Sequence, residues 1–156
     1  METKLLAQAA AKYFLGLVAV AVLLFVPAAT LRFWNAWLLI VILFVPMLIV
    51  GAALLIKNPE LLRKRLNARE EEAEQKAVVL LGGLMFAAGF VVAGLDYRYQ
   101  WSALPGWLVA AAAVGFVLGY LLYAEVLREN TYLSRTVAIQ EGQKVVDTGL
   151  YAIIRH

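Results

Sequence analysis

Four long apolar stretches constrain this chain more than any other feature of its sequence. They are rich in Leu, Val, Ala and Gly, and their central parts contain no ionisable residue. A helix of about 20 apolar residues is long enough to cross a hydrocarbon core about 30 Å thick. The pattern therefore predicts four transmembrane helices, at Tyr13–Leu31, Trp34–Ile56, Ala77–Leu95 and Trp107–Leu127.

The overall composition also predicts an all-α membrane protein. Hydrophobic residues make up 63% of the 156 residues and charged residues only 16%, which is more apolar surface than a soluble domain of this length can bury. The chain has no cysteine and a single histidine, His156. Disulfides and thiolate metal sites are therefore excluded, and no metal site is expected.

The basic residues predict how the four helices cross the membrane. Twelve of the 14 lie before the first stretch, between the second and third, or after the fourth, and only Arg32 and Arg98 lie in the two opposite loops. Because cytoplasmic loops carry the excess of Lys and Arg, we expect two helical hairpins with both termini cytoplasmic, by default in a bacterial cytoplasmic membrane. No nucleic-acid partner is expected, since these cations sit beside membrane helices without a groove of stacking aromatic residues.

Aromatic residues cluster at the two short loops on the side opposite the termini. Tryptophan and tyrosine favour the headgroup level of a bilayer. We therefore expect one aromatic belt on this outer side, formed by Trp34, Trp37, Tyr97, Tyr99, Trp101 and Trp107.

The connector at 57–76 begins with a helix-start signal. Asn58-Pro59-Glu60 supplies an N-cap residue, a proline for the first helical position and an acid for the first turn. The residues that follow place Leu62, Leu66 and Ala73 roughly on one side of a helix. This predicts a helix lying at the membrane surface. A solvated charged connector is the alternative, because Glu70-Glu71-Glu72 would be repelled by anionic lipid.

Small residues recur in the third and fourth stretches. Glycines at helical spacing let two backbones approach closely, which is a main source of helix association in lipid. We interpret them as sites of internal helix packing, with a homodimer through Gly115 and Gly119 as the alternative. The residues concerned are Gly82, Gly83, Gly89 and Gly94 in the third stretch and the GxxxG pair Gly115 and Gly119 in the fourth.

The chain changes character after the four-helix region at 1–127. Glu125 and Arg128 are three residues apart and able to pair, as a helix-end anchor or as part of a polar pocket. Further on, 136–140 and 144–146 flank a predicted short hairpin, and Asp147-Thr148-Gly149 reads as a turn that opens another helix. Tyr151 and Arg155 would share a face of that helix. Such a face suits an anion or a cofactor carboxylate, and an interfacial Tyr and Arg would explain it equally well.

The run QKVVDTGLYAIIRH, following AEVLRENTYLSR, resembles the isoprenylcysteine carboxyl methyltransferase family, within the wider group that includes phospholipid N-methyltransferases. KNPELLRKRL resembles the segment that follows an early membrane hairpin in that family. The family's pattern is T-G-P-Y-x-x-x-R-H-P-x-Y, and Leu150 stands here where proline is common. The matching residues are Thr148, Gly149, Tyr151, Arg155 and His156.

The resemblance implies an integral membrane enzyme that moves a methyl group from S-adenosylmethionine to a lipophilic acceptor, such as the carboxylate of an isoprenylcysteine. Glu129 and Asn130 are expected near the acceptor, and Arg155 and His156 are expected to orient the reactants through polar contacts. The cofactor-binding residues implied are Lys144, Val145, Val146, Thr148, Gly149, Tyr151 and His156.

Two alternatives to this function stay open. Within enzymes, the acceptor could be a phospholipid amine. In a different class, a non-catalytic four-helix scaffold or partner subunit would explain composition, topology and the GxxxG spacing without any site. The sequence stops before the family's next proline, so 128–156 is expected to be an incomplete start of a cofactor-binding region, and the 156-residue chain alone is expected to bind the cofactor weakly or not at all.

Overall fold

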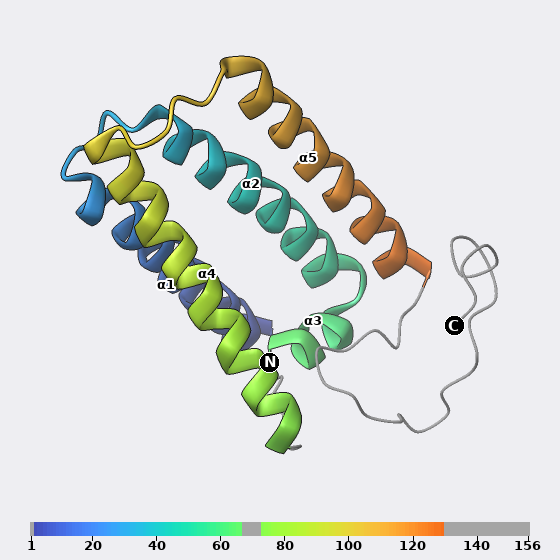
Figure 1. Cartoon of the computed structure of the whole chain (residues 1–156). Helices are drawn as coiled ribbons and strands as arrows, with labels where there is room; N and C mark the ends of the chain where they lie inside the picture. The colour runs from blue at the N-terminus through green and yellow to red at the C-terminus, as the bar shows by residue number, and fades with distance from the viewer. Residues whose placement is uncertain (1, 67–72, 130–156) are drawn as a thin grey trace.

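The computed structural model describes residues 2–66 and 73–129, and these residues form five α-helices and no strand. Four of the helices are long and apolar enough to cross a membrane, which confirms the predicted all-α architecture with four spans (Figure 1). The helices are α1 (Glu2–Ala28), α2 (Trp34–Lys57), the short α3 (Pro59–Leu66), α4 (Ala73–Tyr99) and α5 (Gly106–Glu129).

Each of the four long helices extends beyond its predicted apolar stretch at one end or both, and α1 ends at Ala28, before the predicted end at Leu31. α1 begins at Glu2, well before the predicted start at Tyr13, and α4 continues to Tyr99. Hydropathy locates the part of a helix that suits the hydrocarbon core, but polar residues without a helix breaker continue the same helix outside it. α1 and α4 are each followed by a residue in the left-handed region, Ala29 at φ 54° and Gln100 at φ 55°, which is how many helices end.

The four long helices follow a spatial order different from their chain order. α1 makes its most extensive contacts with α4 and also packs against α2, while α5 packs against α2. The resulting sequence across the molecule is α4, α1, α2, α5 (Figure 1). α1 and α2 therefore form the predicted first hairpin, whereas α4 and α5 follow one another in the chain without packing extensively on each other.

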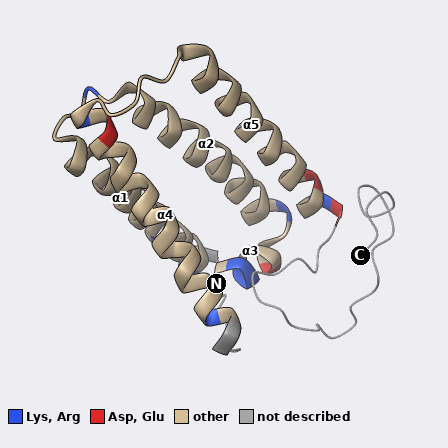
Figure 2. Cartoon of the chain, in the orientation of Figure 1, with Lys and Arg blue, Asp and Glu red and all other residues tan. Residues whose placement is uncertain are grey.

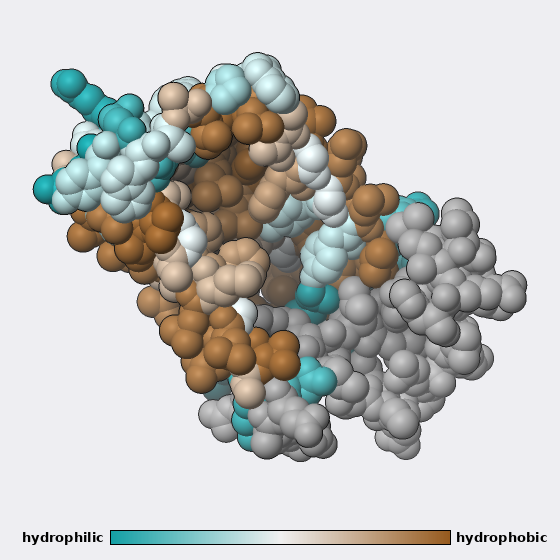
Figure 3. Space-filling model, in the orientation of Figure 1, coloured by the Kyte–Doolittle hydropathy of each residue, from teal (hydrophilic) through white to brown (hydrophobic). Residues whose placement is uncertain are grey.

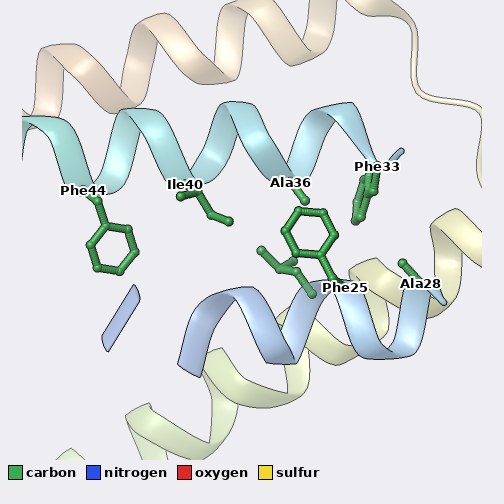
Figure 4. Packing of buried hydrophobic residues seen from close by; sticks show 7 residues of the cluster. Phe25, Ala28, Phe33, Ala36, Ile40 and Phe44 are labelled. Carbon is green, nitrogen blue, oxygen red and sulfur yellow. The ribbon is translucent and has the colours of Figure 1, made fainter. Parts of the chain in front are cut away.

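The main hydrophobic core lies between α1 and α2. Phe25 and Ala28 of α1 meet a row on the facing side of α2 (Figure 4). Successive members of that row are separated by three or four residues, the helical spacing that produces one continuous face. The row consists of Phe33, Ala36, Ile40 and Phe44.

Gly94 marks the closest approach between α4 and α1. A Cβ at this position would lie 2.5 Å from the Leu24 carbonyl oxygen, 3.0 Å from Pro27 Cβ and 3.2 Å from the Ala28 nitrogen. Only a glycine lets the two backbones come this close. The interpretation of small residues as packing sites is thus confirmed for Gly94.

The other five glycines of that interpretation have open space around them. No described heavy atom lies within 4 Å of the Cβ position at Gly82, Gly83, Gly89, Gly115 or Gly119. Within the residues that the structure describes, internal packing through these glycines is therefore wrong. Their spacing makes small-residue faces, but the helix order leaves those faces without a neighbouring helix. The homodimer through Gly115 and Gly119 stays a prediction.

The loops after α1 and α4 lie at the same end of the molecule. The Phe33 and Tyr97 rings stack with centroids 4.3 Å apart, and the Tyr97 hydroxyl donates a hydrogen bond to the Arg32 carbonyl oxygen at 3.2 Å. Nearby, Tyr99 and Trp101 stack at 5.7 Å. These contacts join Tyr97 to the loop after α1 and Tyr99 to Trp101, and the location of the six aromatic residues at the headgroup level stays a prediction.

Candidate functional site at the α3 end

α3 begins with the cap that the sequence predicts. The Leu61 backbone N–H donates to Asn58 Oδ1 at 3.1 Å, and Pro59 occupies the first helical position. Leu61 and Leu62 are buried, while Arg63 and Lys64 are exposed. α3 is thus a short helix with one apolar side against the bundle. The predicted apolar side was wrong for Ala73, because α3 ends at Leu66 and Ala73 begins α4, and the location at the membrane surface stays a prediction. Residues 67–72 lie outside the described part of the chain.

α3 lies across one end of the bundle and joins helices that are distant in the chain. The Lys12 ammonium of α1 donates to the Leu66 carbonyl oxygen. On the other side, the Arg65 guanidinium donates to the Tyr123 hydroxyl of α5 and lies 5.2 Å from the centroid of the same ring. Lysines and arginines gather at this end, which we call the α3 end (Figure 2).

The last turn of α5 carries a small ionic cluster. The Arg128 guanidinium lies 2.5 Å from a Glu125 carboxylate oxygen and 3.3 Å from one of Glu129. The predicted pairing of Glu125 with Arg128 is therefore confirmed. The Arg128 side chain is 70% exposed, so the pair adds little to stability and suits the helix-end anchor better than a buried polar pocket.

Two tyrosines bind consecutive carbonyls of α2. The Tyr13 hydroxyl of α1 donates to the Phe44 carbonyl oxygen at 3.2 Å, and the Tyr120 hydroxyl of α5 donates to the Leu43 carbonyl oxygen at 3.0 Å. Both acceptors lie just before Pro46, whose missing N–H would have bonded to the Ile42 carbonyl four residues earlier. The two hydroxyl bonds therefore lie next to the acceptor that the proline leaves without its helical donor, and they tie α1 and α5 to α2.

Replacing Tyr120 by Phe is expected to loosen α5. The ring remains, but the hydroxyl bond to Leu43 is lost, and such bonds between membrane helices contribute about 0.6 kcal/mol on average and up to about 1.7 kcal/mol. A titration with denaturing detergent should show this decrease in the unfolding free energy. Tyr99→Phe is the control, because Tyr99 is 56% exposed at the opposite end. An equal loss in both variants would show that the Tyr120 bond has no special role.

A groove runs between α4 and α5. Figure 3 shows a hollow with a hydrophobic floor between these two helices, which do not pack extensively on each other. α2 lies behind it (Figure 1), and α3 crosses its lower end. We call this hollow the α4–α5 groove. The groove has an apolar floor, and the cations of the α3 end lie at its lower end.

Nearly all of the predicted site residues fall outside the described part of the chain. Glu129 is the last described residue of α5, and its carboxylate contacts Arg128. The structure thus leaves the proposed contact of Glu129 with a methyl acceptor as a prediction. The residues outside the described ranges are Asn130, Lys144, Val145, Val146, Thr148, Gly149, Tyr151, Arg155 and His156.

The contact of Arg65 with Tyr123 was missed by sequence reasoning. The two residues are 58 positions apart, and no local period relates them, so only the folded arrangement of α3 and α5 could reveal the pair.

Over residues 2–66 and 73–129, the structure shows no buried polar side chain and no group of three His, Cys, Asp or Glu that could hold a metal ion.

Scans against protein-family models, curated proteins and solved structures found no match to this chain.

Proposed function

We propose that this chain forms the membrane part of an S-adenosylmethionine-dependent methyltransferase that acts on a lipophilic acceptor. The observation that carries the proposal is the run of Thr148, Gly149, Tyr151, Arg155 and His156 in the segment after α5, which resembles the cofactor motif of isoprenylcysteine carboxyl methyltransferases. Four apolar helices before that segment suit an enzyme whose acceptor arrives from the bilayer.

The described residues that precede this segment fit the charges of the cofactor. S-Adenosylmethionine carries a carboxylate and two cationic groups, the amine and the sulfonium. The α3 end offers cations for a carboxylate, and Glu125 in the last turn of α5, which pairs with the exposed Arg128, offers a carboxylate for a cation. When bound, the cofactor supplies the methyl group and the driving force for its transfer. The protein has to align donor and acceptor and to exclude water.

In the proposed orientation, the α3 end faces the cytoplasm. Twelve of the 14 basic residues lie in the segments assigned to that side, which is the distribution of the positive-inside rule. This orientation places both termini, and with them the proposed cofactor segment, on the side where S-adenosylmethionine is made.

A non-catalytic four-helix scaffold is the second candidate. The observation that favours it is the lack of any buried polar or charged side chain among the described residues, since catalytic sites in membranes usually hold such groups. A scaffold predicts that alanine at Tyr151, Arg155 or His156 has no effect.

Cofactor binding tests the proposal directly. S-Adenosylmethionine binding is measured by calorimetry in nanodiscs for the natural protein that carries this sequence. We expect binding and about a 10- to 100-fold loss on Arg155→Ala or His156→Ala, because hydrogen bonds to charged groups contribute about 1.5–3 kcal/mol. Arg98→Ala, at the opposite end, is the matched control.

Either result of that measurement is informative. Binding that is unaffected by Arg155→Ala and His156→Ala, or no binding at all, would contradict the proposal and favour the scaffold. Where binding is found, transfer of a labelled methyl group to an isoprenylcysteine or to phosphatidylethanolamine distinguishes the two acceptor classes.

A further inference from the structure

We propose that the α4–α5 groove binds an anionic phospholipid, with an acyl chain along α5 and the phosphate at the α3 end. This lipid site does not rest on the proposed methyl transfer, although both draw on the cations of the α3 end, and it depends only on residues that the structure describes. The proposal combines the shape of the groove, the open face of α5 and the charge at one end.

One face of α5 leads along the groove to Arg65. Tyr123 contacts Arg65 of α3, and Gly119 and Gly115 lie one and two helical turns before Tyr123 on the same face. The Cβ positions of both glycines are open. Around Gly119 and Gly115, this face of α5 is therefore not covered by any described residue. It has room for a flexible hydrocarbon chain.

The rest of the groove surface is apolar. Its floor appears as hydrophobic surface in Figure 3, while the wall on the right of the hollow is white to pale teal, and many large apolar side chains of α4 and α5 are exposed. In a bilayer, such a surface is covered by lipid tails, because leaving it in water would cost about 25 cal/mol for each Å². The shape and the low polarity of the groove thus favour an acyl chain. The charge at the ends of the groove determines which lipid headgroup fits.

The charge is strongly unequal at the two ends of the groove. The α3 end carries Arg63, Lys64 and Arg65 on one helix, with Glu60 as the acid of that helix. Lys57 at the end of α2 and Lys12 of α1 add two further cations. The carboxylates of Glu125 and Glu129 contact Arg128. Among these described residues the cations outnumber the carboxylates, and this excess attracts a phosphate whose own charge is not neutralised by a choline or ethanolamine group.

Arg65 is the residue best placed to select the headgroup. Its guanidinium lies beside the Tyr123 ring at the end of the open α5 face, and a guanidinium has five N–H donors in a geometry that matches phosphate oxygens. One of its terminal nitrogens donates to the Tyr123 hydroxyl. A phosphate at this point would receive donors from Arg65 while the acyl chain runs past Gly119 and Gly115.

Native mass spectrometry of the purified chain can measure this site. Phosphatidylglycerol and phosphatidylcholine with identical acyl chains are added in turn, and the fraction of lipid-bound protein is compared. We expect phosphatidylglycerol to bind several-fold more tightly. Arg65→Gln should reduce that preference about three- to fivefold, as expected for one cation near a lipid surface, while Arg98→Gln at the other end should leave it unchanged.

A second pair of variants tests the groove separately from the charge. Gly119→Leu places a side chain on the open face and should decrease binding of both lipids. Val114→Phe, at an exposed position on another side of α5, is the control and should have no effect. Circular dichroism is used to check that each variant is folded. If Arg65→Gln does not fold, Lys57→Gln provides an independent test of the charge.

Two results would overturn the proposal. Equal affinity of the original chain for the two lipids would remove the headgroup selectivity. A loss in Arg65→Gln together with full binding in Gly119→Leu would place the lipid at the α3 surface and not in the groove.

Discussion

Gly94→Leu is expected to separate α4 from α1 and to lower the unfolding free energy by about 3 kcal/mol, the upper end of the usual range for over-packed interiors. The first added atom alone would lie 2.5 Å from the Leu24 carbonyl oxygen and 3.2 Å from the Ala28 nitrogen. Both are backbone atoms, so no side-chain rotation can relieve the clash, and α4 has to move away. The loss is measured by titration with denaturing detergent.

Gly89→Leu is the matched control for this prediction. Gly89 belongs to the same helix, and no described heavy atom lies within 4 Å of its Cβ position. The substitution should be neutral or slightly stabilising, because leucine favours a helix more than glycine does. Equal loss of stability in the two variants would mean that the close approach at Gly94 is not what holds α4 in place.

Leu24→Ala is expected to lower the unfolding free energy by about 1–3 kcal/mol. Leu24 is 1% exposed in the core shared by α1 and α2. In water-soluble proteins such a truncation costs about 2–5 kcal/mol, the sum of lost transfer energy and the cavity left behind. In a membrane, lipid is as apolar as leucine, so the transfer contribution falls away and the packing contribution remains.

Leu118→Ala separates packing from hydrophobicity. Leu118 is 55% exposed on α5, and the same three carbons are removed without a cavity. The unfolding free energy of this variant should change by less than about 0.5 kcal/mol. A loss as large as that of Leu24→Ala would show that the removed carbons stabilise the protein through their apolar character alone and that the core contributes nothing specific.

Hydropathy was sufficient to find the four long helices, because the cost of an unsatisfied backbone in lipid makes any long apolar stretch helical. It could not find the helix ends: α1 starts at Glu2 because nothing in its polar first turns breaks the helix. It also could not tell which helices touch. The spacing of Gly115 and Gly119 equals that of packed glycines elsewhere, yet the described neighbours leave both open.

In the candidate site too, local contacts were predictable from the sequence and contacts between distant segments were not. The cap at Asn58 and the pair of Glu125 with Arg128 depend on residues three positions apart, and both were predictable from the sequence. The contact of Arg65 with Tyr123 and the bond from Tyr120 to Leu43 join segments far apart in the chain. Such pairs depend on the order of helices across the bundle, which no local pattern encodes.

The pairing of α1 with α4 has a consequence for biosynthesis. Membrane helices enter the bilayer in the order in which the ribosome makes them, so α1 and α2 are in place before α4 exists. The face of α1 that receives Gly94 is therefore first covered by lipid, and α4 has to displace that lipid when it arrives. Docking of α4 is then an exchange of lipid for the helix face that carries Gly94, and the packing of α5 on α2 completes the bundle.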